Sequence, residues 1–241
     1  MTSLSIIIPA YNEAGRIVPT LRAFHEWLTA GRYSFEIIVV DDGSGDDTVF
    51  VLEELKHNGM PELSVVRVPI NKGKGHAVRT GMLAARGAFR LFSDADGSTP
   101  VQELDKMLPC LQDGSADIVI GSRYTAGALV TKAQPAIRVL WSRLCNRIVQ
   151  RVLLPGIADP HCGFKAFTAA AAAAVFSSCR VEGWSFDLEL LAIARSQDLR
   201  IKEVGVQWAN DERSKARIRQ VPRAIADVYR VRRRLRSLQQ A

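Results

Sequence analysis

Short apolar runs alternate with segments of helical periodicity along the first half of the chain, and this alternation constrains the fold more than any other feature. The apolar runs are Leu4–Ala10, Phe35–Val40, Leu63–Val68, Phe89–Phe92 and Asp117–Gly121. Helical patterns cover Glu13–Ala30, Thr48–His57, Gly75–Arg86 and Gln102–Leu111. Such an order is typical of right-handed βαβ crossovers, which build a mostly parallel sheet with helices on both faces. Ligands bind such α/β sheets at the carboxyl ends of the strands.

Two acids follow the fourth apolar run, in the sequence Ser-Asp-Ala-Asp-Gly at residues 93–97. Extended backbone sends residues i and i+2 to the same side, so Asp94 and Asp96 can direct two carboxylates at one point. Like charges this close resist joint ionisation unless a cation joins them. Mg²⁺ or Mn²⁺ fits this pattern, because hard cations are held by one or two carboxylates together with substrate phosphates. An acidic turn, punctuated by Gly97 and Pro100, is the alternative interpretation.

Aromatic and polar residues close the first apolar run, at residues 9–13. Pro9, Tyr11 and Glu13 could offer a ring and polar atoms to a nucleotide base. Asn12 could equally be the N-cap of the following helix, which would make the motif ordinary helix-start chemistry.

Four acids follow the second apolar run. Asp41 and Asp42 end the strand and are placed to accept hydrogen bonds from a base or a ribose. Asp46 and Asp47 come later and suit the N-terminus of the next helix, where the helix dipole favours negative charge. The first two acids are therefore the candidates for ligand binding.

Glycines and lysines precede the third helical pattern, in Asn-Lys-Gly-Lys-Gly at residues 71–75. The spacing of a P-loop is absent, which excludes an NTPase of that class. The segment still predicts a site near phosphates at a helix N-terminus, with Lys72 as the candidate.

The composition is that of a soluble globular protein. The chain has 241 residues, 47% hydrophobic and 24% charged, which is enough for a substantial core. Its four cysteines show no C-x-x-C spacing, and this predicts reduced, packed thiols in the cytosol. We expect no secretory signal, because the first run begins at Leu4. We expect no membrane-spanning helix, because no window of about eighteen residues is wholly apolar.

Positive charge gathers near the C-terminus. The net charge is +7, but the segment from Arg213 to Arg236 holds ten Arg or Lys and one acid, so it carries +9 and the rest −2. Five apolar residues lie near helical spacing within it: Ile218, Val221, Ile225, Val228 and Leu235. A basic amphipathic helix predicts binding to an anionic membrane surface, and a nucleic-acid arm is the competing interpretation. We therefore divide the chain into a body, residues 1–215, and a tail, residues 216–241.

A second amphipathic stretch covers Ala136–Leu154. Its apolar residues lie on one side, with arginines elsewhere. It could contact lipid, or it could be a helix packed on the sheet with arginines that extend to the solvent.

Together these motifs resemble glycosyltransferase family 2, whose members have the GT-A fold, over about residues 4–215. Three downstream segments are similar to the subgroup that acts on polyprenyl phosphates: Gly121–Arg123, Asp159–Lys165 and Gly183–Glu189. The group most resembled is the dolichyl-phosphate β-glucosyltransferases, through Cys-Gly-Phe-Lys at residues 162–165, Val204-x-Val206-x-Trp208 and Ser214-Lys215. The chain departs from that group in Pro160-His161 for Thr-Gln and in Arg213 for glycine, and we expect it to differ also in having no N-terminal membrane helix.

The resemblance implies a metal-dependent, inverting hexosyltransferase that is peripheral on the cytosolic face of a membrane. Glucose from UDP-glucose is the expected transferred sugar, GDP-mannose is the alternative donor, and a polyprenyl or dolichyl phosphate is the expected acceptor. Such a phosphate monoester is largely dianionic at neutral pH, so it needs no strong catalytic base. A soluble or glycan acceptor is the alternative within the family.

The resemblance also implies roles for individual residues. The implied catalytic residues are Asp94, Asp96, Arg123, Asp159 and Lys165, the first two holding Mg²⁺ or Mn²⁺ and the other three serving the acceptor phosphate. The implied donor-binding residues are Pro9, Tyr11, Glu13, Asp41, Asp42, Lys72, Ala95, Ser98, Ser214 and Lys215. Ordinary surface ion pairs are the alternative for Arg123 and Lys165. For Asp187 and Glu189, a buried structural role near a helix start fits as well as a functional one.

A different class of function has to be weighed as well, namely a basic nucleic-acid-binding protein or a non-catalytic scaffold. It would leave the ordered acids at the strand ends unexplained. Those acids would also repel a phosphate backbone. We therefore expect no nucleic-acid partner.

Overall fold

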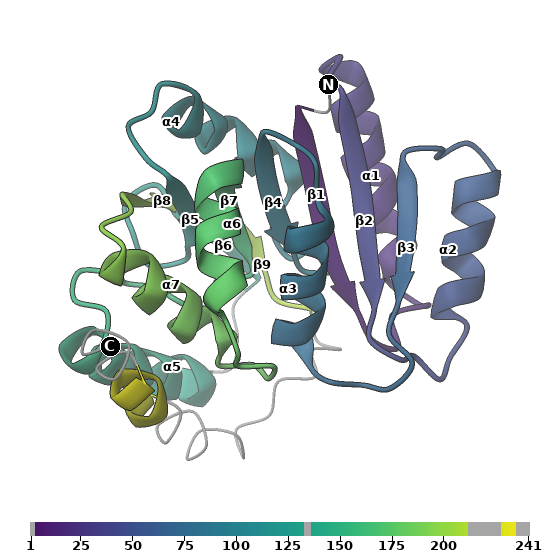
Figure 1. Ribbon diagram of the computed structural model, residues 1–241. Coiled ribbons are helices and arrows are strands. Elements are labelled where there is room, and N and C mark those ends of the chain that lie inside the picture. Colours follow the sequence, from purple (N-terminus) through teal and green to yellow (C-terminus); the bar gives the residue numbers. More distant parts are fainter. Residues whose placement is uncertain (1–2, 133–135, 212–227, 235–241) are drawn as a thin grey trace.

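The computed structural model describes residues 3–132, 136–211 and 228–234. Its main element is a seven-stranded sheet with the strand order β3-β2-β1-β4-β7-β5-β8 (Figure 1). The strands are β1 (Leu4–Ala10), β2 (Phe35–Asp41), β3 (Leu63–Arg67), β4 (Phe89–Ser93), β5 (Ile118–Ser122), β7 (Phe164–Thr168) and β8 (Ile201–Gly205). The first five agree with the predicted runs to within one residue at either end. A smaller sheet pairs β6 (Leu129–Lys132) with β9 (Gln207–Ala209).

The strands that carry the predicted motifs run in one direction. β1 pairs in parallel with β2 on one side and with β4 on the other, with Ala10 opposite Asp41 and Ile7 opposite Phe92. The carboxyl ends of these three strands therefore meet at one edge of the sheet. β7 is antiparallel to both of its neighbours, so its first residue, Phe164, lies opposite Ser93 at that same edge.

Helices cover both faces of the sheet, and the predicted fold class is confirmed. One face is covered by α1 (Ile17–Ala30), α2 (Thr48–His57), the 3₁₀ helix η1 (Val101–Lys106) and α4 (Leu108–Gln112). The other is covered by α3 (Lys74–Ala84), α6 (Ala169–Ser178) and α7 (Phe186–Ser196), which lie in front of the sheet in Figure 1. The buried side chains of α1 include Ile17, Leu21, Phe24 and Leu28, which recur at helical spacing.

Two helices differ from the prediction in more than their last one or two residues. The first begins at Ile17 rather than Glu13, and Asn12 is not its N-cap: Asn12 has a φ of 54° and its side-chain oxygen accepts the amide of Gly45 at 2.8 Å. The helix predicted over residues 102–111 is divided into η1 and α4. Pro109 accounts for the division, because proline has no N–H to continue the α-helical hydrogen bonds.

The C-terminal part of the chain gives a mixed result. The amphipathic stretch at residues 136–154 forms α5 (Ala136–Val152), and residues 228–234 are helical. Val228 was predicted on a membrane-facing stripe, but it is buried in the protein core together with Val231, so that prediction is wrong for this residue. The other four residues of the stripe lie outside the described residues. None of the helices in the described ranges combines the length and the hydropathy that a membrane span needs.

The cysteines agree with the expectation of reduced, packed thiols. All four are free, three of them are buried, and Cys145 is half-buried. Burial raises the pKa of the Cys162 thiol to about 12, which keeps it protonated at neutral pH.

Candidate active site

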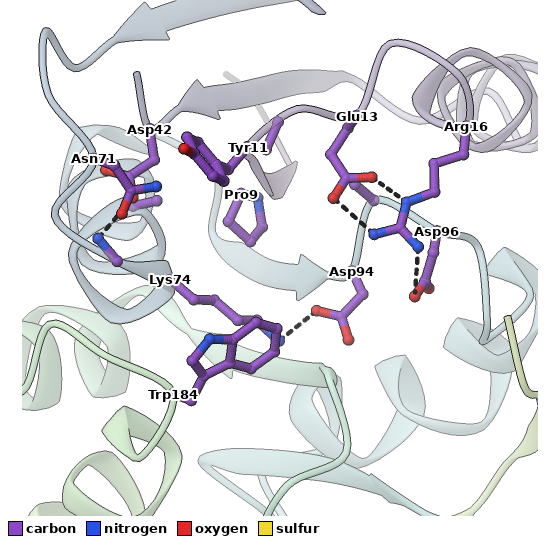
Figure 2. A pocket seen from close by; sticks show the side chains of 14 residues that line it. Pro9, Tyr11, Glu13, Arg16, Asp42, Asn71, Lys74, Asp94, Asp96 and Trp184 are labelled. Atoms are coloured by element: carbon purple, nitrogen blue, oxygen red, sulfur yellow. Dashed lines mark hydrogen bonds and ion pairs between the residues drawn. The ribbon is translucent and has the colours of Figure 1, made fainter. Parts of the chain in front are cut away.

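A cavity of about 330 Å³ lies at the carboxyl edge of the sheet, where β1, β2 and β4 end (Figure 2). Segments that are far apart in the sequence meet in it. Its lining residues are Pro9, Ala10, Tyr11, Glu13, Arg16, Asp42, Asn71, Gly73, Lys74, Ala77, Asp94, Ala95, Asp96 and Trp184. The cavity thus brings together seven of the residues that the sequence proposed: Pro9, Tyr11, Glu13, Asp42, Asp94, Ala95 and Asp96.

Asp94 and Asp96 both point into the cavity, just beyond the end of β4 (Figure 2). The amide of Asp94 donates to the carbonyl of Gly163 at 3.1 Å, and the amide of Ser98 donates to Asp96 Oδ1 at 3.0 Å. Burial, and then the negative charge of Asp94, raises the pKa of Asp96. The two carboxylates therefore repel each other, and a cation between them would relieve the repulsion.

Gly163 allows the carboxylate of Asp94 to lie against the start of β7. A methyl group on Gly163 would come within 2.1 Å of Asp94 Oδ2. Any larger residue would collide with this carboxylate, which gives a physical reason for a glycine in the Cys-Gly-Phe-Lys segment.

The donor set fits a divalent metal ion. Two carboxylates offer the hard oxygen ligands that Mg²⁺ and Mn²⁺ prefer. Within the described ranges, no group of three or more His, Cys, Asp or Glu side chains is arranged to hold a metal. An ion at Asp94 and Asp96 would therefore need further oxygen ligands from water or from a substrate, as Mg²⁺ sites with few protein ligands do.

Two cations face these carboxylates. Lys74 belongs to the segment 71–75 that was predicted near phosphates but was not itself named as a site residue, and Arg16 was not predicted. Lys74 Nζ lies 2.5 Å from Asp94 Oδ1. Arg16 forms an ion pair with Glu13, and its Nη1 lies 3.9 Å from Asp96 Oδ2 and 3.3 Å from Asp211 Oδ2. Arg16 lies three residues after Glu13, the acid that follows β1, and this spacing is the sequence feature that could have identified it.

Lys72, which was predicted near phosphates, occupies a different place. Its side chain is exposed and does not line the cavity, whereas Lys74, two residues later, does. Gly73 between them has a φ of 112°, a conformation that favours glycine, and this turn sends the two lysines in different directions.

Asp42 presents its carboxylate to the cavity in a fixed orientation. Its two oxygens accept the amides of Lys72 at 3.0 Å and Gly73 at 2.6 Å. Asp41, its neighbour, is as deeply buried as Asp42, but it accepts the amide of Ser44 at 3.3 Å and does not line the cavity. Of the two acids that end β2, only Asp42 is therefore placed to contact a ligand in this cavity.

Trp184 forms the wall opposite the strand ends and was not named as a site residue from sequence. It is 50% exposed, and Lys74 Nζ lies 5.3 Å from the centre of its ring. It belongs to the segment Gly183–Glu189, and the similarity of this segment to a family motif could have pointed to Trp184 as a site residue. Ser214 and Lys215 lie outside the described residues.

Arg123 and Asp159 form a second, rigid pair outside the cavity lining. The guanidinium donates to both carboxylate oxygens, each at 2.7 Å, and Asp159 is fully buried. Glu203 orients this pair by accepting the amides of Ala158 at 2.9 Å and Asp159 at 2.8 Å. Burial would raise the pKa of Asp159, but the charge of Arg123 outweighs it and lowers that pKa. The alternative of an ordinary surface ion pair is therefore wrong for this pair.

Lys165 is fully buried, so it is not a surface ion pair either. Its Nζ donates to the carbonyl of Cys162 and to Asp187 Oδ1, each at 2.6 Å. The ammonium group does not line the cavity, so its direct effect is on the backbone before β7. Asp187 and Glu189 have the buried position near a helix start that the sequence offered as one interpretation. Glu189 accepts the amides of Arg180 at 2.7 Å and Val181 at 2.6 Å.

Comparison with solved structures shows the fold. The chain is similar to glucosyl-3-phosphoglycerate synthase from Mycobacterium tuberculosis, crystallised with Mn²⁺, UDP and phosphoglyceric acid. The TM-score is 0.70 at 20% identity, over 95% of this chain and 77% of that one. S. aureus TarS is also similar, with a TM-score of 0.61 at 18% identity, over 95% of this chain and 64% of that one.

Comparison of sequences shows the family. The family model Glycosyl transferase family 2 matches residues 5–176. A dolichyl-phosphate β-glucosyltransferase of Drosophila melanogaster is 39% identical over 223 residues, which cover 88% of this chain and 68% of the relative. Its namesake in Homo sapiens is 34% identical over 223 residues, covering 88% and 69%. The family match and these relatives show that the chain belongs to glycosyltransferase family 2, and its structural neighbours show the fold. The chain is therefore a glycosyltransferase with a GT-A-like fold.

Proposed function

We propose that this glycosyltransferase moves glucose from UDP-glucose to dolichyl phosphate or another polyprenyl phosphate, with inversion at the anomeric carbon. The cavity that joins Asp42 to the carboxylates of Asp94 and Asp96 carries this proposal, because it offers a nucleoside contact and a metal site side by side. The relatives named as dolichyl-phosphate β-glucosyltransferases support the acceptor. The structural neighbour crystallised with UDP and Mn²⁺ supports the donor nucleotide and the metal.

The nucleoside would bind at the ends of β1 and β2. Asp42 is held by two backbone amides, so its free lone pairs can accept hydrogen bonds from the base or the ribose. Tyr11, which is 40% exposed, and Pro9 supply flat apolar surfaces beside it. A few fixed polar groups in a cavity of about 330 Å³ suit a nucleotide-sized ligand.

The diphosphate would lie between the start of α3 and the end of β4. Asp94 and Asp96 would hold Mg²⁺ or Mn²⁺ there. When bound, a divalent cation supplies positive charge that stabilises the negative charge developing on the leaving diphosphate. Arg16 holds Asp96 and Glu13 in place beside it.

The acceptor would approach from the side of Arg123. An oxygen of its phosphate forms a bond to the anomeric carbon while the bond from that carbon to the diphosphate oxygen breaks, and no proton has to be removed from the dianionic acceptor. A guanidinium fixed by Asp159 is suited to orient such a phosphate, because its geometry is planar and fork-shaped. Lys165 would act indirectly, by holding the backbone that supports Asp94.

Transfer assays test this proposal. Radiolabelled UDP-glucose and GDP-mannose are each incubated with the intact protein, a polyprenyl phosphate and Mg²⁺ or Mn²⁺. We expect label in the lipid from UDP-glucose only, and its loss in a folded Asp96→Asn variant. Transfer from GDP-mannose alone would overturn the proposed donor. Transfer to a soluble acceptor alone would overturn the proposed lipid, and near-normal turnover by Asp96→Asn would overturn the metal site.

We further propose that the basic tail holds the enzyme at the cytosolic face of a membrane. Polybasic segments gain about 1 kcal/mol per Lys or Arg near an anionic lipid surface. Removal of residues after Lys215 would be a poor test, because Val228 and Val231 are part of the core. Neutralising substitutions avoid this problem: Arg217→Gln, Arg219→Gln, Arg223→Gln and Arg236→Gln.

Co-sedimentation with vesicles rich in anionic lipid measures the effect of these four substitutions. They should remove about 4 kcal/mol, and therefore reduce binding about a thousandfold at low salt. High salt should release the wild-type protein in the same way. Equal sedimentation of the wild type and the variant would count against the tail as the membrane contact.

A further inference from the structure

Lys74 has an ion-pair partner that the metal would also need. Its Nζ lies 2.5 Å from Asp94 Oδ1, while its side chain is only 13% exposed. The rings of Trp184 and Phe186 lie 5.3 Å and 5.9 Å from the same atom and shield it from solvent. The ammonium group therefore occupies one side of the carboxylate that is proposed to hold the metal (Figure 2).

The position of Lys74 in its helix is electrostatically unusual. It is the first residue of α3, where the helix dipole favours negative charge rather than positive charge. Gly73 and Lys74 both line the cavity, so the helix N-terminus and the ammonium group present positive charge to the same space. Such an arrangement attracts an anion, and phosphate groups bind well at helix N-termini. In the structure described here, the carboxylate of Asp94 is the anion that satisfies Lys74.

We propose that Lys74 exchanges its partner during donor binding, from Asp94 in the empty enzyme to the diphosphate in the complex. While it is paired with Asp94, the lysine opposes metal binding by charge repulsion and by occupying a carboxylate oxygen. When the diphosphate arrives, the lysine transfers to it and Asp94 becomes available to the metal. This inference rests on the proposed nucleotide donor and metal site.

The charges that line the cavity support the exchange. Four acids and two bases line it, so its formal charge is −2, and a divalent cation alone would be attracted to it. Lys74 reduces that attraction at Asp94 specifically. A donor with two negative charges, bound together with a divalent cation, adds no net charge. The exchange therefore favours the metal–donor complex over the free metal ion and discourages binding of the metal before the donor.

The substitution Lys74→Gln in the intact chain tests the exchange, because it should strengthen the binding of Mn²⁺ alone and weaken the binding of UDP. Free Mn²⁺ is measured by electron paramagnetic resonance, first without nucleotide. The affinity for Mn²⁺ alone should rise at least about tenfold, since removing one positive charge about 5 Å from a divalent ion matters this much even at the dielectric constant of water. The affinity for UDP at saturating Mn²⁺, measured by calorimetry, should fall about tenfold or more, because a charge-assisted contact is lost.

Two further variants serve as controls. Lys74→Arg keeps the positive charge and should retain the weak binding of Mn²⁺ alone. Lys56→Gln removes an exposed lysine from the last turn of α2 and should change neither affinity. Thermal unfolding of each variant checks that the fold is intact.

The outcomes separate this inference from the proposed function. If Lys74→Gln binds Mn²⁺ no more tightly than the wild type, or binds UDP equally well, the exchange is wrong. If the wild type binds Mn²⁺ but no UDP, the proposed donor is wrong, and the comparison of Mn²⁺ affinities still decides whether Lys74 opposes the metal.

Discussion

The substitution Gly163→Ala should separate catalysis from stability. The backbone of Gly163 does not have the positive φ that requires glycine, so alanine can adopt its conformation. The added methyl carbon would, however, lie 2.1 Å from Asp94 Oδ2 and 2.4 Å from Asp94 Cγ. Non-bonded heavy atoms are usually about 3.5 Å apart or more, so the carboxylate must move by roughly 1 Å or more.

The expected losses of catalytic rate and of stability both follow from this displacement of the Asp94 carboxylate. A misplacement of about 1 Å in a reacting site can cost about a hundredfold in rate, and we expect that loss in kcat/KM. The Asp94 side chain is flexible and 35% exposed, so moving it sacrifices little more than its ion pair with Lys74. Because the carboxylate of this pair is partly exposed, we expect the loss to be about 1 kcal/mol of unfolding free energy, well below the cost of breaking a fully buried pair.

Three measurements on one preparation test the prediction: transfer rate, Mn²⁺ affinity and urea unfolding. The control is Gly183→Ala, because a methyl group there has no heavy atom within 4 Å other than those of its own chain neighbours. A Gly163→Ala protein with a rate within about threefold of the wild type would refute the geometric argument. So would a loss of stability of about 3 kcal/mol or more, because it would show that the backbone, and not the carboxylate, yields.

Other predictions concern Asp42 and the Arg123–Asp159 pair. Asp42→Ala should weaken binding of UDP much more than binding of Mn²⁺, and unchanged UDP affinity by calorimetry would contradict its role. Asp159→Asn leaves the guanidinium of Arg123 without its buried counter-charge and should cost about 3 kcal/mol of unfolding free energy at pH 7. Because the pKa of Asp159 is lowered in the folded state, the stability it contributes is present above its unfolded pKa of about 4 and is lost as pH falls below that value. The difference in urea midpoint between the wild type and this variant should therefore shrink in acid, and a difference that is constant down to pH 2 would contradict the assignment.

The elements of the fold could be predicted because their signals are local. Apolar runs of four to seven residues mark β1–β5, and helical periodicity marks α1–α3; the bounds of α2 agree at both ends. The strand-end position of Asp42, Asp94 and Asp96 followed from the direction of parallel strands. Failures arose where one residue changed the local geometry: Gly73 turns Lys72 away from the cavity, and Pro109 divides a predicted helix.

Contacts between distant segments could not be predicted in the same way. Trp184 reaches the cavity from the segment before α7, and Arg16 from the turn before α1, so neither shares a motif with Asp94. The family resemblance assigned Lys165 to the acceptor phosphate, but in the structure its ammonium group forms a buried ion pair with Asp187. Val228 has the spacing of an exposed amphipathic stripe, and only the packing of the core shows that it is covered.

The position of β7 sets the order in which the sheet can fold. It follows β4 and β5 in the sequence but lies between them, so β5 and β8 join the rest of the sheet only after β7 has paired. The strands β1, β2 and β3 pair residues only 31 and 26 positions apart in the sequence, so they lose the least entropy on pairing and can form first. β4 pairs with β1 over 85 positions and with β7 over 71 to 79. At that stage β4, which leads into Asp94 and Asp96, has not yet paired, and neither has the segment of Gly163, whose carbonyl accepts the amide of Asp94. The proposed metal site would therefore be completed late in folding, when the second half of the sheet pairs with the first.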